Sequence, residues 1–219
     1  MKDYRNELFQ SSLGPTTSVP TNRAAARNTV LELTRISVFS ALVAVGTLLS
    51  NLLFGITLPP PLGEITAAPA FYMAIAVLFS RKVSFWSTAI GSAIGESISI
   101  FVLGQVPAVF ALTFLPGIVL ARAPEVLIIY RFRDKLRGLL LGMGLATVYE
   151  TVVFFLIDWP VYSFTEFYCS SPGCGSAGIL QGFWLASLDF ATLIDLVWIP
   201  VSLVLILVVQ RVYQVQHFI

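Results

Sequence analysis

Six ionisable side chains stand inside stretches of sequence that are otherwise apolar. They are the acids Glu96, Glu125, Glu150, Asp189 and Asp195 and the base Arg122. A charge at the centre of a membrane helix costs about 2.5–3.5 kcal/mol on insertion scales, so each group should face a partner, water or a ligand. Carboxylates accept hydrogen bonds and attract cations, and this is the chemistry that the residue types favour.

Arg122 and Glu125 are three residues apart, which places them on one face of a helix. We expect them to form a structural ion pair. The remaining four acids then have no basic partner within the apolar stretches; they are Glu96, Glu150, Asp189 and Asp195. They belong to three predicted helices and lie toward the outer side, with Asp195 nearer the middle. Separate hydration could explain any one acid, but a convergent polar site open to the outside explains them together better.

Aromatic residues are frequent toward the same end of the predicted helices. Among them are Trp159, Tyr162 and Trp184. Trp and Tyr at a membrane surface usually serve as anchors. A pocket that holds a cation over an aromatic face uses the same residue types, so the sequence leaves both interpretations open.

Few residues here are suited to metal binding or enzymatic catalysis. The chain has one His and two Cys, which excludes most metal sites by ligand number. Catalytic signatures such as Gly-x-Ser-x-Gly are absent, so we expect neither an enzyme nor a cofactor. Cys169 and Cys174 lie in a predicted outer loop, 158–177, where a small disulfide ring is the expected role.

The composition places the chain among membrane proteins. Of its 219 residues 57% are hydrophobic and 11% charged, against about 25% charged residues in a soluble domain. The formal net charge of +1 argues against a nucleic-acid-binding protein, which shows a basic face.

The apolar stretches predict six membrane-spanning helices. Their expected ranges are 33–54, 67–79, 83–103, 106–130, 139–157 and 178–209, with Pro200 inside the last. Twelve of the thirteen Lys and Arg residues fall on one side of these crossings, which short basic loops mark as cytoplasmic. The second range is short, but a re-entrant loop there would place Arg81 and Lys82 outside.

We therefore expect an all-α protein of the cell membrane with both termini cytoplasmic. Residues 1–29 are predicted to be a disordered cytoplasmic tail. Residues 30–211 form the six-helix domain, and 212–219 a short cytoplasmic tail.

Small residues recur where helices could approach each other closely. Gly91 with Gly95, and Gly138 with Gly142, are expected to pack within the molecule. On the first helix Ser37, Ala41 and Ala44 lie in a small-residue stripe, for which internal packing and contact with a partner are both open.

The chain resembles the S components of energy-coupling factor (ECF) transporters. Three features carry the resemblance, and the first is the number of predicted spans, six. The second is the segment Ile36-Ser-Val-Phe-Ser-Ala-Leu-Val-Ala44, which is similar to that family's Ala-x-x-x-Ala region. The third is the segment Leu58-Pro-Pro-Pro-Leu-Gly63. In the first segment Ser37 and Ala41 occupy the two small positions. The resemblance implies outside capture of a micronutrient and docking of this stripe on a coupling membrane subunit, which works with two ABC-type ATPases. It also implies that the ligand binds at the outer side.

Three functions follow as hypotheses. In the first, the chain is such an S component, and its acids favour a cationic, thiamine-like or pyrimidine-like micronutrient. In the second, it is a stand-alone proton-coupled secondary transporter that uses Glu150, Asp189 and Asp195. In the third, it is a membrane scaffold without a ligand.

Overall fold

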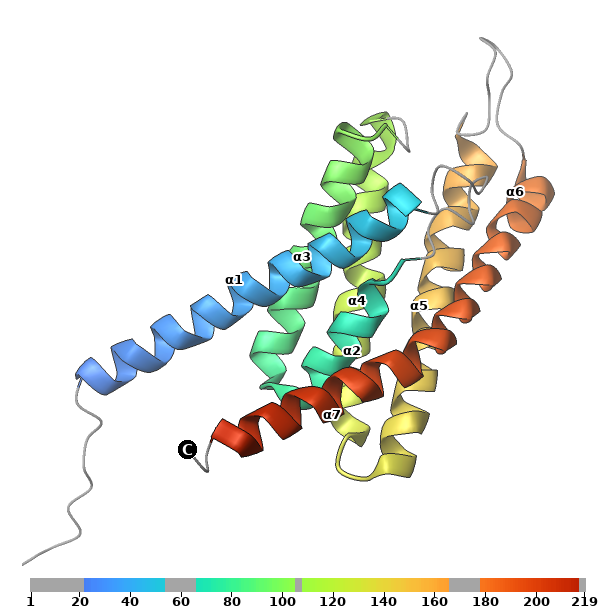
Figure 1. The fold of residues 1–219 in the computed structure, drawn as a ribbon. Helices are drawn as coiled ribbons and strands as arrows, with labels where there is room; N and C mark the ends of the chain where they lie inside the picture. Colours follow the sequence, from blue (N-terminus) through green and yellow to red (C-terminus); the bar gives the residue numbers. More distant parts are fainter. Residues whose placement is uncertain (1–21, 54–65, 105–107, 166–177, 217–219) are drawn as a thin grey trace, which may run out of the picture. The chain divides into compact units, whose positions relative to one another are not determined.

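The computed structural model describes residues 22–53, 66–104, 108–165 and 178–216 (Figure 1). Every regular element among them is helical. In chain order they are α1 (Asn22–Leu53), α2 (Ala68–Leu78), α3 (Arg81–Phe101), η2 (Ala108–Phe110), α4 (Ala111–Phe132), α5 (Leu136–Phe164), α6 (Ile179–Ala186), η3 (Ser187–Val197) and α7 (Trp198–Gln216). The chain divides into two compact units, 1–34 and 35–219.

In the first unit the described residues, 22–34, are helical throughout. The helix thus begins at Asn22, earlier than the expected boundary at residue 30. Near the end of this unit the Thr34 hydroxyl donates to the carbonyl of Val30 at 2.9 Å. Residues 1–21 of the predicted tail lie outside the described part of the chain.

Within the described residues, four helices are long and apolar enough to cross a membrane. They are Ala26–Leu49, Ala111–Phe132, Leu136–Phe164 and Ile179–Val212. Of the six predicted crossings, those at α2 and α3 are not among these four. The 21 residues of α3 are sufficient in length, but its serines and Glu96 make it more polar than the other long helices.

Helix α2 is short and is surrounded by protein. Its 11 residues extend about 17 Å, roughly half the thickness of a hydrocarbon core. Pro69 stands in its first turn, where the missing N–H has no helical acceptor to lose. Most of the helix is buried, and it contacts α3, α4 and α7. An apolar helix that is covered on nearly all sides is an inner element of the bundle and has little surface left for lipid.

The carboxyl end of α2 is held by Arg133, a basic residue that the sequence only marks as cytoplasmic. Its Nη1 donates to the carbonyls of Val77 at 3.2 Å and Phe79 at 3.0 Å, and its guanidinium lies 3.8 Å from the Tyr130 ring centroid. A cation at this position donates hydrogen bonds to carbonyls that have no partner within the helix. Its charge also interacts favourably with the negative end of the helix dipole.

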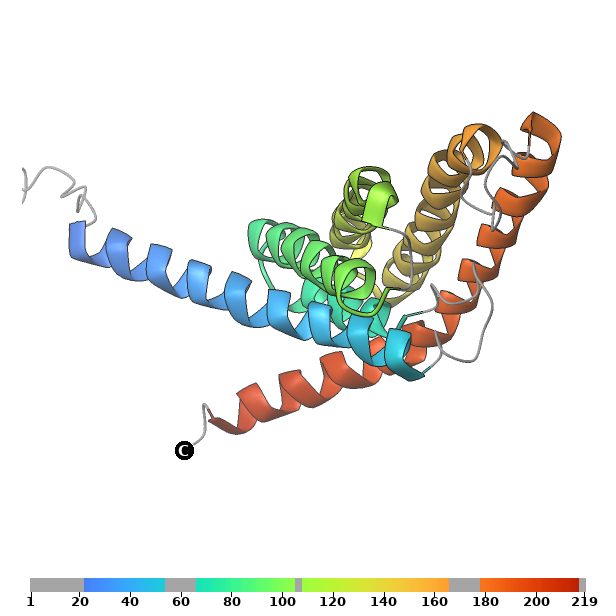
Figure 2. The ribbon, with the colours of Figure 1, turned by 90° about the horizontal axis from the view of Figure 1, so that it is seen from above.

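In the second unit α4 packs between α3 and α5 (Figure 1, Figure 2). Close approach of α3 to the 35–53 part of α1 depends on Gly91 and Gly95. A Cβ on Gly91 would lie 2.6 Å from the Ser40 carbonyl oxygen, and one on Gly95 would lie 2.8 Å from the Thr47 Cβ. Gly138 and Gly142 pack against Phe132 in the same way. The expected intramolecular role of both glycine pairs is confirmed.

The small-residue stripe on α1 is split between two surroundings. Ser37 and Ala41 are exposed, whereas Ala44 is buried within the second unit. Ala44 thus packs within the molecule, and contact of the stripe with a partner stays a prediction that Ser37 and Ala41 are placed to make.

Two further boundaries differ from the sequence prediction. Helix α5 continues through Pro160 to Phe164, so Trp159 and Tyr162 lie on a helix and the predicted outer loop begins later than residue 158. The last predicted span is divided into α6, η3 and α7. Cys169, Cys174 and the prolines between 57 and 64 lie outside the described residues.

Replacement of Gly91 by Ala tests the packing of α3 on α1. The added methyl group meets backbone as well as Val43, so we expect a lower apparent melting temperature in detergent, equivalent to about 1–3 kcal/mol. Gly144→Ala is the matched control, because nothing lies within 4 Å of a Cβ there. Equal melting temperatures for the two variants would contradict the close approach.

Candidate functional site

A buried arginine connects four segments of the second unit. Arg122, at mid-length of α4, is 1% exposed. Its Nε donates to Glu150 Oε1 on α5 at 2.9 Å, forming an ion pair. Its Nη1 lies 3.5 Å from the Thr47 hydroxyl on α1, and its Nη2 donates to the Thr66 hydroxyl before α2 at 3.1 Å. A guanidinium has five N–H donors, which suits it to join several elements at once.

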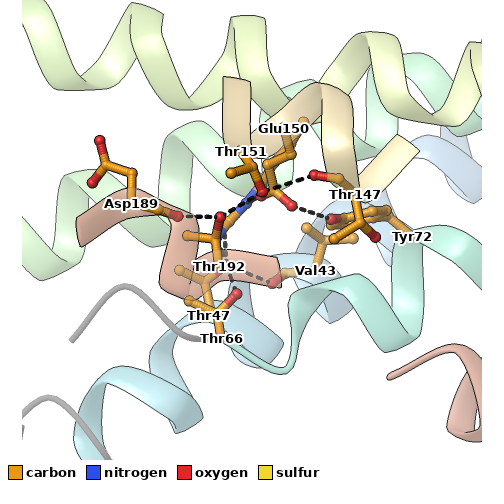
Figure 3. A network of polar contacts seen from close by, with 10 residues as sticks. Val43, Thr47, Thr66, Tyr72, Thr147, Glu150, Thr151, Asp189 and Thr192 are labelled. Carbon is orange, nitrogen blue, oxygen red and sulfur yellow. Dashed lines mark hydrogen bonds and ion pairs between the residues drawn. The ribbon is translucent and has the colours of Figure 1, made fainter. Parts of the chain in front are cut away.

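Glu150 is held at both of its carboxylate oxygens. Besides the bond from Arg122 to Oε1, the Tyr72 hydroxyl on α2 donates to Oε2 at 3.2 Å, and Tyr72 itself is fully buried (Figure 3). The predicted pair of Arg122 with Glu125 was therefore wrong, and so was the prediction that Glu150 has no basic partner. Spacing along one helix allows a pair, but Arg122 has its partner on the neighbouring helix.

Two of the predicted acids reach the interior because of an unusual helix. The η3 segment forms 11 residues of 3₁₀-helix, whereas most such runs end after three or four. Residues three apart eclipse each other in this geometry, and the buried positions follow that period: Ala186, Asp189, Thr192 and Asp195. In an α-helix Asp195 would point about 120° away from Asp189. The 3₁₀ winding is what turns both acids toward the core.

Local hydrogen bonds favour this winding. The Thr192 hydroxyl donates to the Asp189 carbonyl, three residues earlier, at 2.6 Å. Such side-chain bonds to backbone carbonyls compete with α-helical hydrogen bonds. Pro200, just beyond η3, has no N–H for the carbonyl four residues before it. These two residues give the break in the last span a physical cause.

A pair of threonines joins η3 to α5. The hydroxyls of Thr151 and Thr192 lie 2.7 Å apart, within hydrogen-bond distance (Figure 3). Each hydroxyl has a single proton, so the one that donates across this pair gives up its bond to a backbone carbonyl, which is that of Thr147 for Thr151 and that of Asp189 for Thr192. The polar face of η3 thus lies against the face of α5 that carries Glu150.

The centre contains more acids than bases. Arg122 is accompanied by Glu150, Glu125 and Asp195, which are all buried and close enough for their charges to interact. The Trp198 side chain, at the start of α7, lies close to Asp195. If every carboxyl group were ionised, this centre would hold two more negative charges than positive ones. Buried charge on this scale must be balanced by protons or by a cationic ligand.

A second group of acids lies around Asp158 on α5. Asp158 is buried, and its Oδ2 accepts a hydrogen bond from Tyr162 at 3.0 Å. The charges of Asp189 and Glu96 act on it, so these three carboxyl groups are near one another. Glu96, on α3, is only partly buried. The structure therefore brings the four predicted acids into two neighbouring groups that the Asp189–Asp195 face of η3 connects.

The aromatic residues pack mainly on one another. Phe155 and Trp159 of α5 contact Phe183 of α6 with ring centroids 5.4–5.5 Å apart at steep angles, and Phe190 of η3 joins them. The Trp159 indole N–H donates to the Ile179 carbonyl at 3.1 Å. Trp184 is 66% exposed, and its ring meets Phe183 edge to face with the centroids 5.8 Å apart. These contacts fasten α6 to α5.

Several members of the centre were missing from the sequence prediction. Thr47, Thr66 and Tyr72 were overlooked because single hydroxyls in apolar helices give no signal until their partner is known. The predicted outer loop includes Asp158, although the spacing of four between Asp158 and Tyr162 is that of a helix. Among the described residues no group of three His, Cys, Asp or Glu side chains is placed to hold a metal ion.

Comparisons of this chain with protein-family models, with curated proteins and with solved structures found no match.

Tyr72→Phe tests the inner bond to Glu150. The variant keeps the ring and removes the donor to a buried carboxylate, so we expect a loss of about 1.5–3 kcal/mol in unfolding free energy. Tyr149→Phe is the control, because its hydroxyl donates at an exposed position to the carbonyl of Leu120. A loss for Tyr72→Phe no greater than that for Tyr149→Phe would show that the bond does not stabilise the centre.

Proposed function

We propose that this chain is the substrate-capture subunit of an ECF-type importer in the cell membrane. In this proposal it binds a micronutrient from outside and passes it on through a coupling membrane subunit that two ABC-type ATPases drive. The chain has no Gly-x-x-x-x-Gly-Lys-Ser/Thr loop, so nucleotide hydrolysis would belong to those partners.

One observation carries the proposal: acids from several helices converge around a single base in an apolar bundle. Ionisable groups inside membrane helices mark substrate or ion pathways by default. Asp189 and Asp195 share one face of η3, and Glu150 on α5 faces the same interior. A ligand with a positive charge or several hydrogen-bond donors would complement this excess of carboxylates. A thiamine-like or pyrimidine-like compound has that chemistry.

The proposal includes six crossings with both termini in the cytoplasm. The basic residues at 81–82, 131–137 and 211 support it, because such clusters stay on the cytoplasmic side. In this topology α2 crosses together with its flanking residues. A non-helical backbone is tolerated at membrane depth where protein covers it, and Thr66, next to α2, is buried.

The exposed part of the α1 stripe is the proposed docking surface for the coupling subunit. Ser37 and Ala41 present small side chains that allow a second helix to come close. Ala44, which is buried, is left out of this surface.

A proton-coupled secondary transporter is the second candidate. It is favoured by the burial of Glu150 and Asp195 beside further acids, an arrangement that proton relays in membrane transporters use. Proteoliposomes that contain this chain alone distinguish the candidates. Uptake driven by a pH gradient without ATP would favour the secondary transporter and contradict the S component. Uptake that requires ATP and the coupling proteins would favour the S component.

Ligand binding by the purified chain tests the substrate class. We expect a cationic, thiamine-like compound to raise the apparent melting temperature, because a ligand of the folded state stabilises it. Asp195→Asn should weaken that binding at least about 30-fold, since it removes the charge that faces the cation.

Glu32→Gln on α1 is the control for this experiment, and its affinity should match that of the wild type. Absence of a shift with every cationic compound tested, or unchanged affinity of Asp195→Asn, would contradict the proposed substrate class.

A further inference from the structure

Glu125 is the carboxyl group of the centre that is least compensated. Its side chain is 0% exposed, and among the described residues neither of its oxygens accepts a hydrogen bond of ordinary geometry. Glu150, in contrast, accepts one bond at each oxygen and is paired with Arg122. The two glutamates differ sharply in how their charge would be stabilised, although both are equally hidden from solvent.

Charged and titratable groups face Glu125 from every element around it. On its own helix, α4, there is Arg122, and α2 contributes Tyr72. From α5 come Glu150 and Tyr149, and from η3 comes Asp195. Arg122 is the one base among these groups, and its Nε is committed to Glu150. An ionised Glu125 would therefore have two other carboxylates near it and no base of its own.

We propose that Glu125 is a proton-binding site inside the bundle, occupied at neutral pH. An isolated carboxylate is very costly in an apolar interior, and a bound proton removes that cost without requiring space. Among the described residues, no group of three acidic, His or Cys side chains is placed to hold a metal ion. The ligand of this site is the proton, taken up from water.

The hydrogen bonds around the three carboxyl groups explain why the proton is on Glu125 and not on Glu150 or Asp195. Glu150 receives donors from Arg122 and Tyr72, which stabilise its ionised form. Asp195 has the Trp198 side chain near it, and among the described residues only its Oδ1 lacks a partner, whereas both oxygens of Glu125 do. A protonated Glu125 becomes a donor itself, and the Tyr72 oxygen can accept its O–H while the Tyr72 hydroxyl donates to Glu150. The proton thus links Glu125, through Tyr72, to the Arg122–Glu150 pair.

This site differs in kind from the proposed ligand-binding acids. It needs no substrate and no partner protein, and it holds whether or not the chain is a transport subunit. Its effect is to make the charge of the interior depend on the protonation of one residue.

Infrared spectroscopy of the full-length protein in lipid nanodiscs tests the site. A protonated carboxylic acid has a C=O stretch that is well separated from the bands of a carboxylate. We expect this band in the wild-type protein at pH 7. Because the group is buried, the band should keep its frequency when the surrounding H₂O is replaced by D₂O. It should be lost in Glu125→Gln and kept in Glu32→Gln. A band that is unchanged in Glu125→Gln, or absent from the wild type, would overturn the proposal.

A measurement on the wild-type sequence tests the site even if the Glu125→Gln variant fails to fold. Wild-type protein labelled with ¹³C at the glutamate side-chain carboxyl carbon should show the band at lower frequency. A band that does not move would belong to an aspartic acid and would overturn the assignment to Glu125.

Thermal denaturation gives a second readout. Glutamine is close in shape to a neutral glutamic acid, so Glu125→Gln should melt within a few degrees of the wild type at pH 7. As the pH rises above the acidic range in which an exposed glutamate ionises, the wild type should lose stability, because the unfolded chain releases this proton before folded Glu125 does. Glu125→Gln has no such proton and should lose less. A large loss at pH 7 in folded Glu125→Gln protein, with no difference in pH dependence, would show that Glu125 acts as an ionised partner.

Discussion

The buried charge of Arg122 is the constraint on which the rest of this structure depends. A guanidinium cannot give up its proton in a protein, so an apolar bundle that contains one must supply a counterion and hydrogen-bond acceptors. Glu150 supplies the first, and the hydroxyls of Thr47 and Thr66 supply the second. These partners come from α5, from α1 and from the segment before α2. One side chain thereby sets where three other parts of the second unit can lie.

The irregular elements follow from the same requirement. Helix α2 is short and buried, and it places Tyr72 against the second oxygen of Glu150. The 3₁₀ winding of η3 aligns Asp189, Thr192 and Asp195 toward α5, where a regular α-helix would separate them. Both departures from a plain membrane helix occur where polar groups must reach the centre. In membrane proteins a broken or shortened helix is tolerated where neighbouring helices cover it.

The sequence predicted the chemistry better than the pairing. Hydropathy was sufficient for the helical class and for the four long apolar helices, and it also marked Arg122, Glu150, Asp189 and Asp195 as residues that must be compensated. It could not show that Arg122 pairs across helices with Glu150, because spacing along the chain reports only neighbours on one helix. The 3₁₀ register was also hidden, since it depends on a threonine bond and a downstream proline rather than on hydropathy.

A double-mutant cycle at Arg122 and Glu150 tests the central role of this pair most directly. The unfolding free energies of the wild type, Arg122→Gln, Glu150→Gln and the double variant would be compared in the same detergent or bilayer. Each single variant should lose about 3–5 kcal/mol, because it leaves one charge buried without its partner. The double variant should lose less than the sum of the two, by about 1–3 kcal/mol. Strictly additive losses would contradict the account, because they would mean that the two residues stabilise the bundle independently.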